Sequence, residues 1–218
     1  MTQPGPSPAP AFPVARWVAL GWLAVWVPSY LPVYGWNNFL QFCDVAVFFT
    51  VIGLWRGSAL LLSSQAVAVL VVDALWTVDV AGRLILGRHI VGGTEYMWSP
   101  SYPLFVRLLS LFHIVWPLIL LWAVRRTGYD RRGWVLQSGI AVVVFVATRL
   151  WCDGHNFNFV MEAPFIRRPM GPVPVHLLLS WLAAVAGMYL PAHFLIARLV
   201  PPRPRLSEGH PGSAVAPR

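Results

Sequence analysis

The stretch Ser58–Ala81, SALLLSSQAVAVLVVDALWTVDVA, decides the fold class because it is a long and almost uninterrupted apolar run. A membrane-spanning helix needs about 20 mainly apolar residues, whereas strands are much shorter and barrel strands alternate between apolar and polar residues. Five further stretches have the same character: Val14–Val33, Phe39–Trp55, Pro103–Val124, Gly133–Trp151 and Val175–Val200. The sequence therefore predicts an all-α integral membrane protein, a bundle of about six transmembrane helices.

The composition of the whole chain agrees with this prediction. Of the 218 residues, 57% are hydrophobic and 11% are charged, whereas soluble domains have roughly 45–50% and about 25%. These values exclude a soluble domain, a disordered chain and a disulfide scaffold. All 16 basic residues are Arg, so lysine chemistry is excluded as well. We interpret the net charge of +8 as a topology signal, and we expect no nucleic-acid partner.

The arginines also predict the orientation and the limits of the membrane domain. Four of them crowd the short loop after the fourth predicted span: Arg125, Arg126, Arg131 and Arg132. Short loops rich in Arg face the cytoplasm, so both termini are expected to be cytoplasmic in a multi-pass protein of the cell membrane. Residues 14–200 form the transmembrane domain, and the Pro-rich segments 1–13 and 201–218 are expected to be disordered tails. A signal peptide is the alternative for the first span, but no small-residue cleavage site follows it.

Ionisable side chains inside the predicted spans need an explanation, because each costs at least about 2.5–3.5 kcal/mol to insert. They are Asp44, Asp73, Asp79, Arg107, His113, Arg149, His176 and His193. Most of them lie in the predicted outer half, below the polar loop 152–162. One wet cavity open to the outer leaflet would satisfy most of these groups at once.

Structural pairing is the alternative explanation of these charges, and the sequence leaves it open. Asp79 and Arg83 are four residues apart and can form a helix ion pair. Arg107 and Arg149 can each neutralise Asp44 or Asp73 across a helix contact, which would stabilise the bundle without any chemistry.

The second predicted span begins with a polar stripe. Asn37, Gln41 and Asp44 are spaced at four and three, so they are expected on one helix face, with Cys43 on the neighbouring face. Cys152 is the only other cysteine. Both cysteines are expected on the outer, oxidising side, so a disulfide between them is an alternative to thiol chemistry.

The fourth predicted span carries a histidine four residues before a proline. Pro117 cannot donate to the carbonyl of His113, so the helix is expected to kink there. A metal site is a weaker hypothesis, because the spacing of its candidate ligands matches no strong zinc pattern. Those candidates are Cys152, Asp153, His155, Glu162 and His176. We therefore predict no metal and no other cofactor.

Three short motifs carry a resemblance to a known family. They are FLQFCDVA at Phe39–Ala46, LSLFH at Leu109–His113, and NFNF at Asn156–Phe159 followed by Glu162-Ala-Pro164. With these motifs the chain resembles the bacterial YwaF-like membrane proteins, which are related to the androgen-induced-gene family of membrane lipid hydrolases and to transmembrane phospholipid acyltransferases. The match covers roughly residues 35–190. Two positions depart from the family pattern, since Gln41 replaces a His and Ala163 replaces a Lys.

The resemblance implies a lipid hydrolase or acyltransferase that acts on membrane lipids. It makes Cys43 the nucleophile and His113 its base, both inside a six-helix bundle. Four side-chain amides are candidate donors to an oxyanion: Asn37, Asn38, Asn156 and Asn158. Arg107 and Arg149 are candidates to bind an anionic head group.

Two other functions remain open at this level. The first is a non-catalytic membrane protein whose charges only pair between helices. The second is a small permease, which we expect to be lined by Asp44, Asp73, Asp79 and His113.

Overall fold

The computed structural model describes residues 11–152 and 154–200, and within these ranges every regular element is helical. The α-helices are α1 (Ala15–Tyr34), α2 (Phe42–Arg56), α3 (Ala59–Leu86), α4 (Leu104–Leu109), α5 (Phe112–Thr127), α6 (Gly133–Trp151), α7 (Val173–Ala184) and α8 (Leu190–Leu199). Short 3₁₀ turns cover Trp36–Leu40, Glu95–Trp98 and Phe157–Phe159. A π-helical turn, Val185–Tyr189, joins α7 to α8.

Within the described residues, five helical segments are long and apolar enough to cross a membrane: α1, α3, α4 with α5, α6, and α7 with α8. This confirms the prediction of an all-helical chain with several apolar spans. The second predicted span differs, because α2 has only 15 residues. Its expected start at Phe39 lies in a 3₁₀ turn, and Gln41 is extended, with φ −67° and ψ 142°. The helix therefore begins at Phe42.

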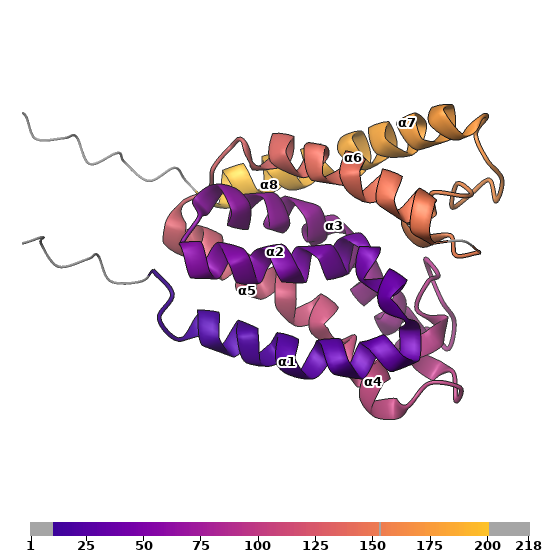
Figure 1. The fold of residues 1–218 in the computed structure, drawn as a ribbon, viewed down its shortest axis with the longest axis horizontal. Helices are drawn as coiled ribbons and strands as arrows, with labels where there is room; N and C mark the ends of the chain where they lie inside the picture. The colour runs from indigo at the N-terminus through magenta and orange to yellow at the C-terminus, as the bar shows by residue number, and fades with distance from the viewer. Residues whose placement is uncertain (1–10, 153, 201–218) are drawn as a thin grey trace, which may run out of the picture.

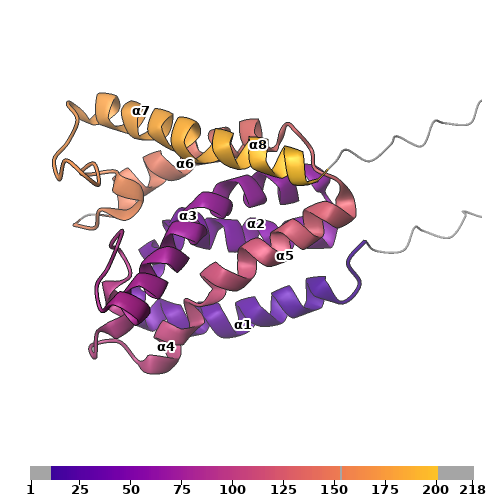
Figure 2. The ribbon, with the colours of Figure 1, turned by 180° about the vertical axis from the view of Figure 1, so that it is seen from behind.

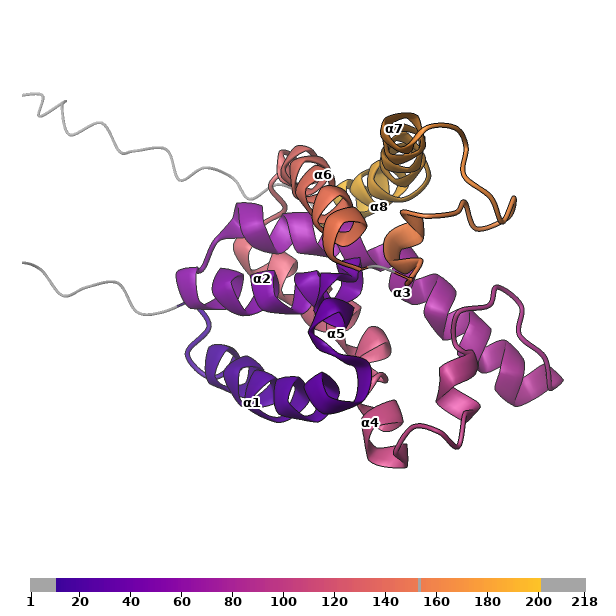
Figure 3. The same ribbon diagram turned by 45° about the vertical axis from the view of Figure 1, so that its right-hand side comes forward.

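The helices run back and forth along one direction, and α3 lies in the middle of the bundle (Figure 1). It contacts α2, α5, α6 and α8. Figures 2 and 3 show α1 on one side of this centre and the α6, α7 and α8 group on the other. The beginning of α1 and the end of α8 lie at the same end of the bundle, which we call the terminal end. The opposite end carries the longer loops, and we call it the loop end.

Small side chains allow α6 to approach the centre closely. A Cβ on Gly133 would lie 2.9 Å from atoms of Ser63, so a larger residue there would push α6 away from α3. The Ser63 hydroxyl also accepts a hydrogen bond of 3.0 Å from the backbone N–H of Asp130. These contacts fix the start of α6 at the terminal end.

Two of the predicted spans are interrupted. The fourth divides at Ser110–Leu111 into α4 and α5, whereas α5 is helical across Pro117. The expected kink at His113 and Pro117 is therefore displaced by about one turn toward the N-terminus. The sixth contains the π-helical turn just before Pro191, where the missing N–H of proline disturbs the regular hydrogen-bonding ladder.

The predicted tails lie mostly outside the described residues, which exclude residues 1–10 and 201–218. Residues 11–13 are described, and Phe12 is buried with its ring 5.4 Å from that of Trp122. The packed domain thus begins slightly before the expected residue 14.

Candidate functional site

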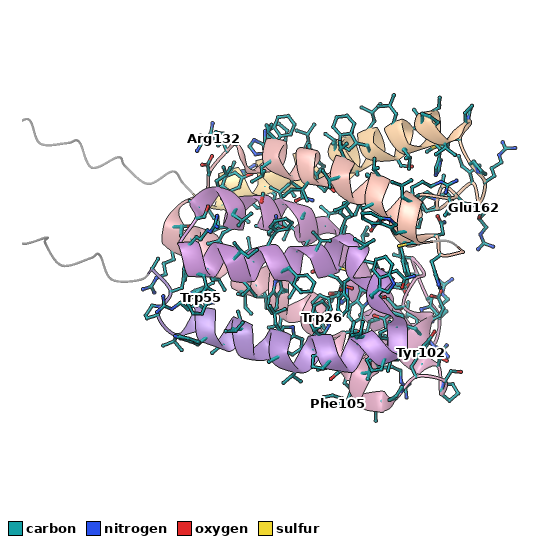
Figure 4. All side chains as sticks on the ribbon, viewed as in Figure 1. Trp26, Trp55, Tyr102, Phe105, Arg132 and Glu162 are labelled. Carbon is teal, nitrogen blue, oxygen red and sulfur yellow. The ribbon has the colours of Figure 1, made fainter. Side chains whose placement is uncertain are left out.

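A cavity of about 450 Å³ lies at the loop end, between α1, α2, α3 and the α4–α5 break. Tyr102, at the loop end in Figure 4, is one of its lining residues. Five of the lining residues were candidates from the sequence: Asn38, Gln41, Cys43, Asp44 and His113. His155, weighed above as a metal ligand, also lines it. The cavity therefore brings together the two residues expected to act as nucleophile and base.

The first turn of α2 presents a thiol and a carboxyl group to this cavity. Asp44 is buried, and its Oδ2 accepts a hydrogen bond of 2.7 Å from the Asn38 amide. The side-chain oxygen of Asn38, Oδ1, in turn accepts a hydrogen bond of 2.7 Å from the side-chain amide of Gln41. The Cys43 thiol donates to Asp44 Oδ1 over 3.8 Å. The expected helical stripe of Asn37, Gln41 and Asp44 is thus wrong, because only Asp44 is in α2, although hydrogen bonds still connect Gln41 to Asp44 through Asn38.

The start of α2 is fixed by a residue from a distant loop. Asn158 Oδ1 accepts a hydrogen bond of 3.1 Å from the Phe42 N–H, and its Nδ2 donates to the Leu40 carbonyl at 2.8 Å and to Thr148 at 3.0 Å. Asn158 therefore satisfies one of the unpaired N–H groups of the first turn. The Asn158 amide, a candidate oxyanion donor from the sequence, is engaged in these bonds and does not line the cavity.

His113 is held in a single orientation on α5. Its Nδ1 lies 2.7 Å from the Ser110 carbonyl, which can only accept, so Nδ1 carries a proton. In the neutral ring the unprotonated nitrogen is then Nε2. The imidazole is stacked between Trp76 and Phe112, with ring centroids 4.7 Å and 4.1 Å away. The ring is thus oriented with one nitrogen available as a base.

The cavity is also lined by hydroxyl groups that the sequence did not single out, among them those of Tyr30, Ser110 and Tyr96. Tyr30 and Ser110 share a hydrogen bond of 2.6 Å, and the Tyr96 hydroxyl accepts one of 3.2 Å from the Trp76 indole. Burial raises the pKa of Tyr96 above its usual value, so this hydroxyl stays protonated. Tyr30 comes from α1 and Tyr96 from the turn Glu95–Trp98, and only the fold brings the two hydroxyls to one cavity.

The thiol and the imidazole face the same cavity from α2 and α5, but each has its own partner. In the described residues the thiol donates to Asp44, and the imidazole donates to the Ser110 carbonyl. Within these residues no hydrogen bond joins Cys43 to His113 directly.

Asp79 does not belong to the cavity, although it was predicted there. Its donors come from the loop after α3: the N–H groups of Ile90, Val91 and Gly92, the Thr94 hydroxyl and the His89 ring. His89 forms the only ion pair of this carboxylate in the described chain, at 2.8 Å. The alternative ion pair with Arg83 does not form among the described residues, where Arg83 donates to the Gly87 carbonyl.

The two arginines expected to neutralise the buried acids do not do so. Arg107 donates to the Met97 carbonyl at 2.8 Å, and Arg149 forms no salt bridge within the described residues. Neither lines the cavity. Asp73 is fully buried on α3, and neither of its carboxyl oxygens has a hydrogen-bond partner among the described residues. Structural pairing with arginine therefore does not explain Asp44 or Asp73.

The polar loop after α6 is held together by its own contacts. Asn156 accepts hydrogen bonds from the N–H groups of Met161 and Glu162 and donates to the Glu162 carbonyl. His176 accepts from the Met170 N–H and donates to the Phe159 carbonyl. Asn156 is thus a loop residue and not a cavity donor. Asn37 also lies outside the cavity lining.

The disulfide and metal alternatives find no support in the described residues. No disulfide joins Cys43 to Cys152, and the Cys152 thiol donates to the Asn37 carbonyl over 3.8 Å. No group of three or more potential metal ligands occurs there. Asp153, one of the candidate ligands, lies outside the described residues.

Comparison with known proteins gives no match: no family model, no curated protein and no solved structure matches this chain. The residues of the cavity are therefore the basis for a functional proposal.

Proposed function

We propose that this chain is a multi-pass protein of the cell membrane that transfers acyl groups from membrane lipids, with Cys43 as nucleophile and His113 as base. The observation that carries the proposal is the shared cavity. It contains a thiol and an imidazole whose Nδ1 is occupied by the Ser110 carbonyl, which leaves Nε2 to accept a proton. The motifs around both residues resemble those of the membrane lipid hydrolases and acyltransferases described above.

The chemistry follows from these two groups. His113 Nε2 takes the thiol proton, and the thiolate attacks the carbonyl carbon of a lipid ester. The ester C–O bond breaks, the leaving alcohol receives the proton from His113, and the acyl group stays on Cys43 as a thioester. Water or a second lipid alcohol then attacks the thioester with His113 as base. The products are a fatty acid or a new ester, and the thiol is regenerated.

The hydroxyl groups of the cavity are candidate hydrogen-bond donors to an oxyanion, a role that the amides outside the cavity are not placed to fill. An oxyanion forms in each step and requires donors nearby. Tyr30, Ser110 and Tyr96 line the same cavity, and we propose them in this role in place of the distant amides. Asn38 is the one predicted amide that lines the cavity, and its side chain is bonded to Asp44 and Gln41.

The proposed topology has six spans and cytoplasmic termini. In this topology α2, preceded by the 3₁₀ turn, is the second of the six spans. It is a short span, because its 15 residues rise only about 22 Å. The terminal end then faces the cytoplasm, and the cavity opens toward the outer leaflet. Two reporters of opposite compartment preference, fused in turn after residue 218, test the orientation. A signal from the reporter that is active only outside the cytoplasm would contradict it.

The test of the chemistry is an acyl adduct on the protein. The purified protein is incubated with phospholipids that carry isotope-labelled acyl chains, and its intact mass is measured. We expect one labelled acyl group on Cys43, no adduct in Cys43→Ala, and an adduct formed at least about 100-fold more slowly in His113→Ala. Cys152→Ala is the matched control, because that thiol is buried outside the cavity lining, and it should retain the adduct.

An unlabelled wild-type protein, together with lipid turnover that survives Cys43→Ala, would overturn the proposal. The permease is the second candidate, and the buried, unpartnered carboxyl of Asp73 favours it. It predicts pH-driven uptake into proteoliposomes that is lost in Asp73→Asn and kept in Cys43→Ala. The two variants therefore separate the two functions.

A further inference from the structure

A second hollow in the molecule lies between α1 and the α4–α5 segment, and it is a long apolar groove of about 1020 Å³. Apolar side chains line it, and many of them are exposed, Val18 at 66% and Leu118 at 62% among them. Almost all of them come from helices long and apolar enough to cross a membrane. Its volume is at the upper end of the roughly 300–1,000 Å³ typical of ligand pockets.

The groove ends at a cation on the terminal end of the bundle. On α5 the lining residues Val115, Ile119 and Trp122 recur at spacings of four and three, so they share one face. Arg126 follows Trp122 by four residues and continues this face. Its guanidinium carbon lies 6.0 Å from the centroid of the Trp122 ring and 5.9 Å from that of Phe12.

The charge of Arg126 has no carboxylate partner in the described chain. The two ion pairs found there join Asp79 to His89 and Asp130 to Arg132. Asp130, the nearest acid along the chain, is therefore already bound by another arginine. A hydrocarbon surface that ends at an unpaired cation is complementary to a lipid whose head group is negative.

We propose that this groove binds one anionic phospholipid, with an acyl chain between α1 and α5 and the phosphate against Arg126. Charge complementarity selects an anionic lipid over a zwitterionic one, because the latter carries its own cation beside the phosphate. The site is distinct from the cavity, because the two hollows have no lining residue in common. It does not depend on the proposed chemistry.

The test counts lipids retained by the whole protein. The protein is equilibrated with equal amounts of phosphatidylglycerol and phosphatidylcholine in detergent, and native mass spectrometry measures the bound species. We expect one retained phosphatidylglycerol per chain. Arg126→Ala should weaken its binding about tenfold, as expected for the loss of one charged hydrogen bond.

Two matched controls separate a site from general surface charge. Arg125→Ala removes the same charge one residue away, about 100° around the helix, and should retain the lipid. Val115→Trp fills the groove without changing charge and should abolish retention, whereas Val142→Trp on the exposed face of α6 should not. If Arg126→Ala fails to fold, Val115→Trp still decides the outcome.

Three results would overturn the site. They are equal retention of the two phospholipids, an equal loss in Arg125→Ala and Arg126→Ala, and full retention in Val115→Trp. Cys43→Ala should bind phosphatidylglycerol like the wild type. A failure of the lipid site and a failure of the proposed catalysis are thus observed in different variants.

Discussion

Asp73 and Asp79 both lie on α3 with fully buried side chains, yet their polar surroundings are opposite. Asp79 accepts three backbone hydrogen bonds from the loop after α3 and has a hydroxyl and an imidazole at its second oxygen. In the part of the chain that the structure describes, Asp73 has no hydrogen-bond partner at either oxygen. The comparison shows that two buried acids on the same apolar helix can differ completely in their hydrogen bonding. Asp79 organises a loop, whereas in the described chain no hydrogen bond compensates the burial of the Asp73 carboxyl group.

The largest effect is expected from removing the well-bonded acid. Asp79→Ala leaves three N–H groups of the 90–92 loop without their acceptor, so it should lower the free energy of unfolding by about 3–5 kcal/mol. Unfolding in mixed micelles of increasing SDS content measures this loss. Asp79→Asn keeps one acceptor oxygen and should lose less. A wild-type unfolding curve for Asp79→Ala would mean that the loop is held by other contacts.

Asn158 tests whether distant side chains can fix the start of a helix as firmly as Asp79 fixes a loop. Asn158→Ala removes the acceptor for the Phe42 N–H and the donor to Leu40 and Thr148. We expect a loss of about 1–2 kcal/mol in the same SDS titration. Asn156→Ala, which affects only its own loop, is the comparison variant. A larger loss in Asn156→Ala would place the main restraint in the loop instead.

The unpartnered acid should show the reverse behaviour. Asp73→Asn replaces one polar group without partners by another of the same shape, so stability should change by less than about 1 kcal/mol in either direction. The measurement is again the SDS titration, run beside Asp79→Asn. A loss as large as that of Asp79→Ala would show that Asp73 has a structural partner in the membrane.

A partly exposed carboxylate at the terminal end gives the smallest expected effect. Hydrogen bonds from Arg132 lower the pKa of Asp130 below its usual value. The stabilisation is therefore present at neutral pH and is lost as the pH falls from about 4 through the lowered pKa. We expect Asp130→Asn to lower the melting temperature by less than about 2 °C at pH 7, and this difference should shrink as the pH falls below about 4. A difference that grows on acidification would reverse the sign.

The apolar spans could be predicted because their signal is local. The run Ser58–Ala81 corresponds to α3, which extends five residues further to Leu86 before Gly87, with φ +71°, ends it. The predicted start of α2 was wrong because the observed start is fixed by hydrogen bonds from Asn158, a residue from a distant part of the chain. The kink predicted at His113 and Pro117 was misplaced for a similar reason. The helix breaks at Ser110–Leu111, whereas the proline rule considers only the residues next to Pro117.

The candidate site was predictable in part. The presence of Cys43, Asp44 and His113 in spans was visible from the cost of polar groups in lipid. The partners were not, because Arg107 and Arg149 can in principle reach several acids and only packing decides which. Tyr30 was missed because aromatic residues are common in apolar spans, and Tyr96 because it lies in the loop after α3, where a polar side chain needs no explanation.

The ring stack around His113 has a further consequence for its surroundings. Phe112 faces the apolar groove and covers one face of the imidazole, while Trp76 covers the other. These two rings cover both faces of the imidazole with hydrocarbon. Only the edge of the imidazole makes polar contacts, with the Ser110 carbonyl at Nδ1 and with the cavity. Replacing Phe112 by a small residue would uncover one face of the imidazole and leave the hydrogen bond between His113 and Ser110 in place.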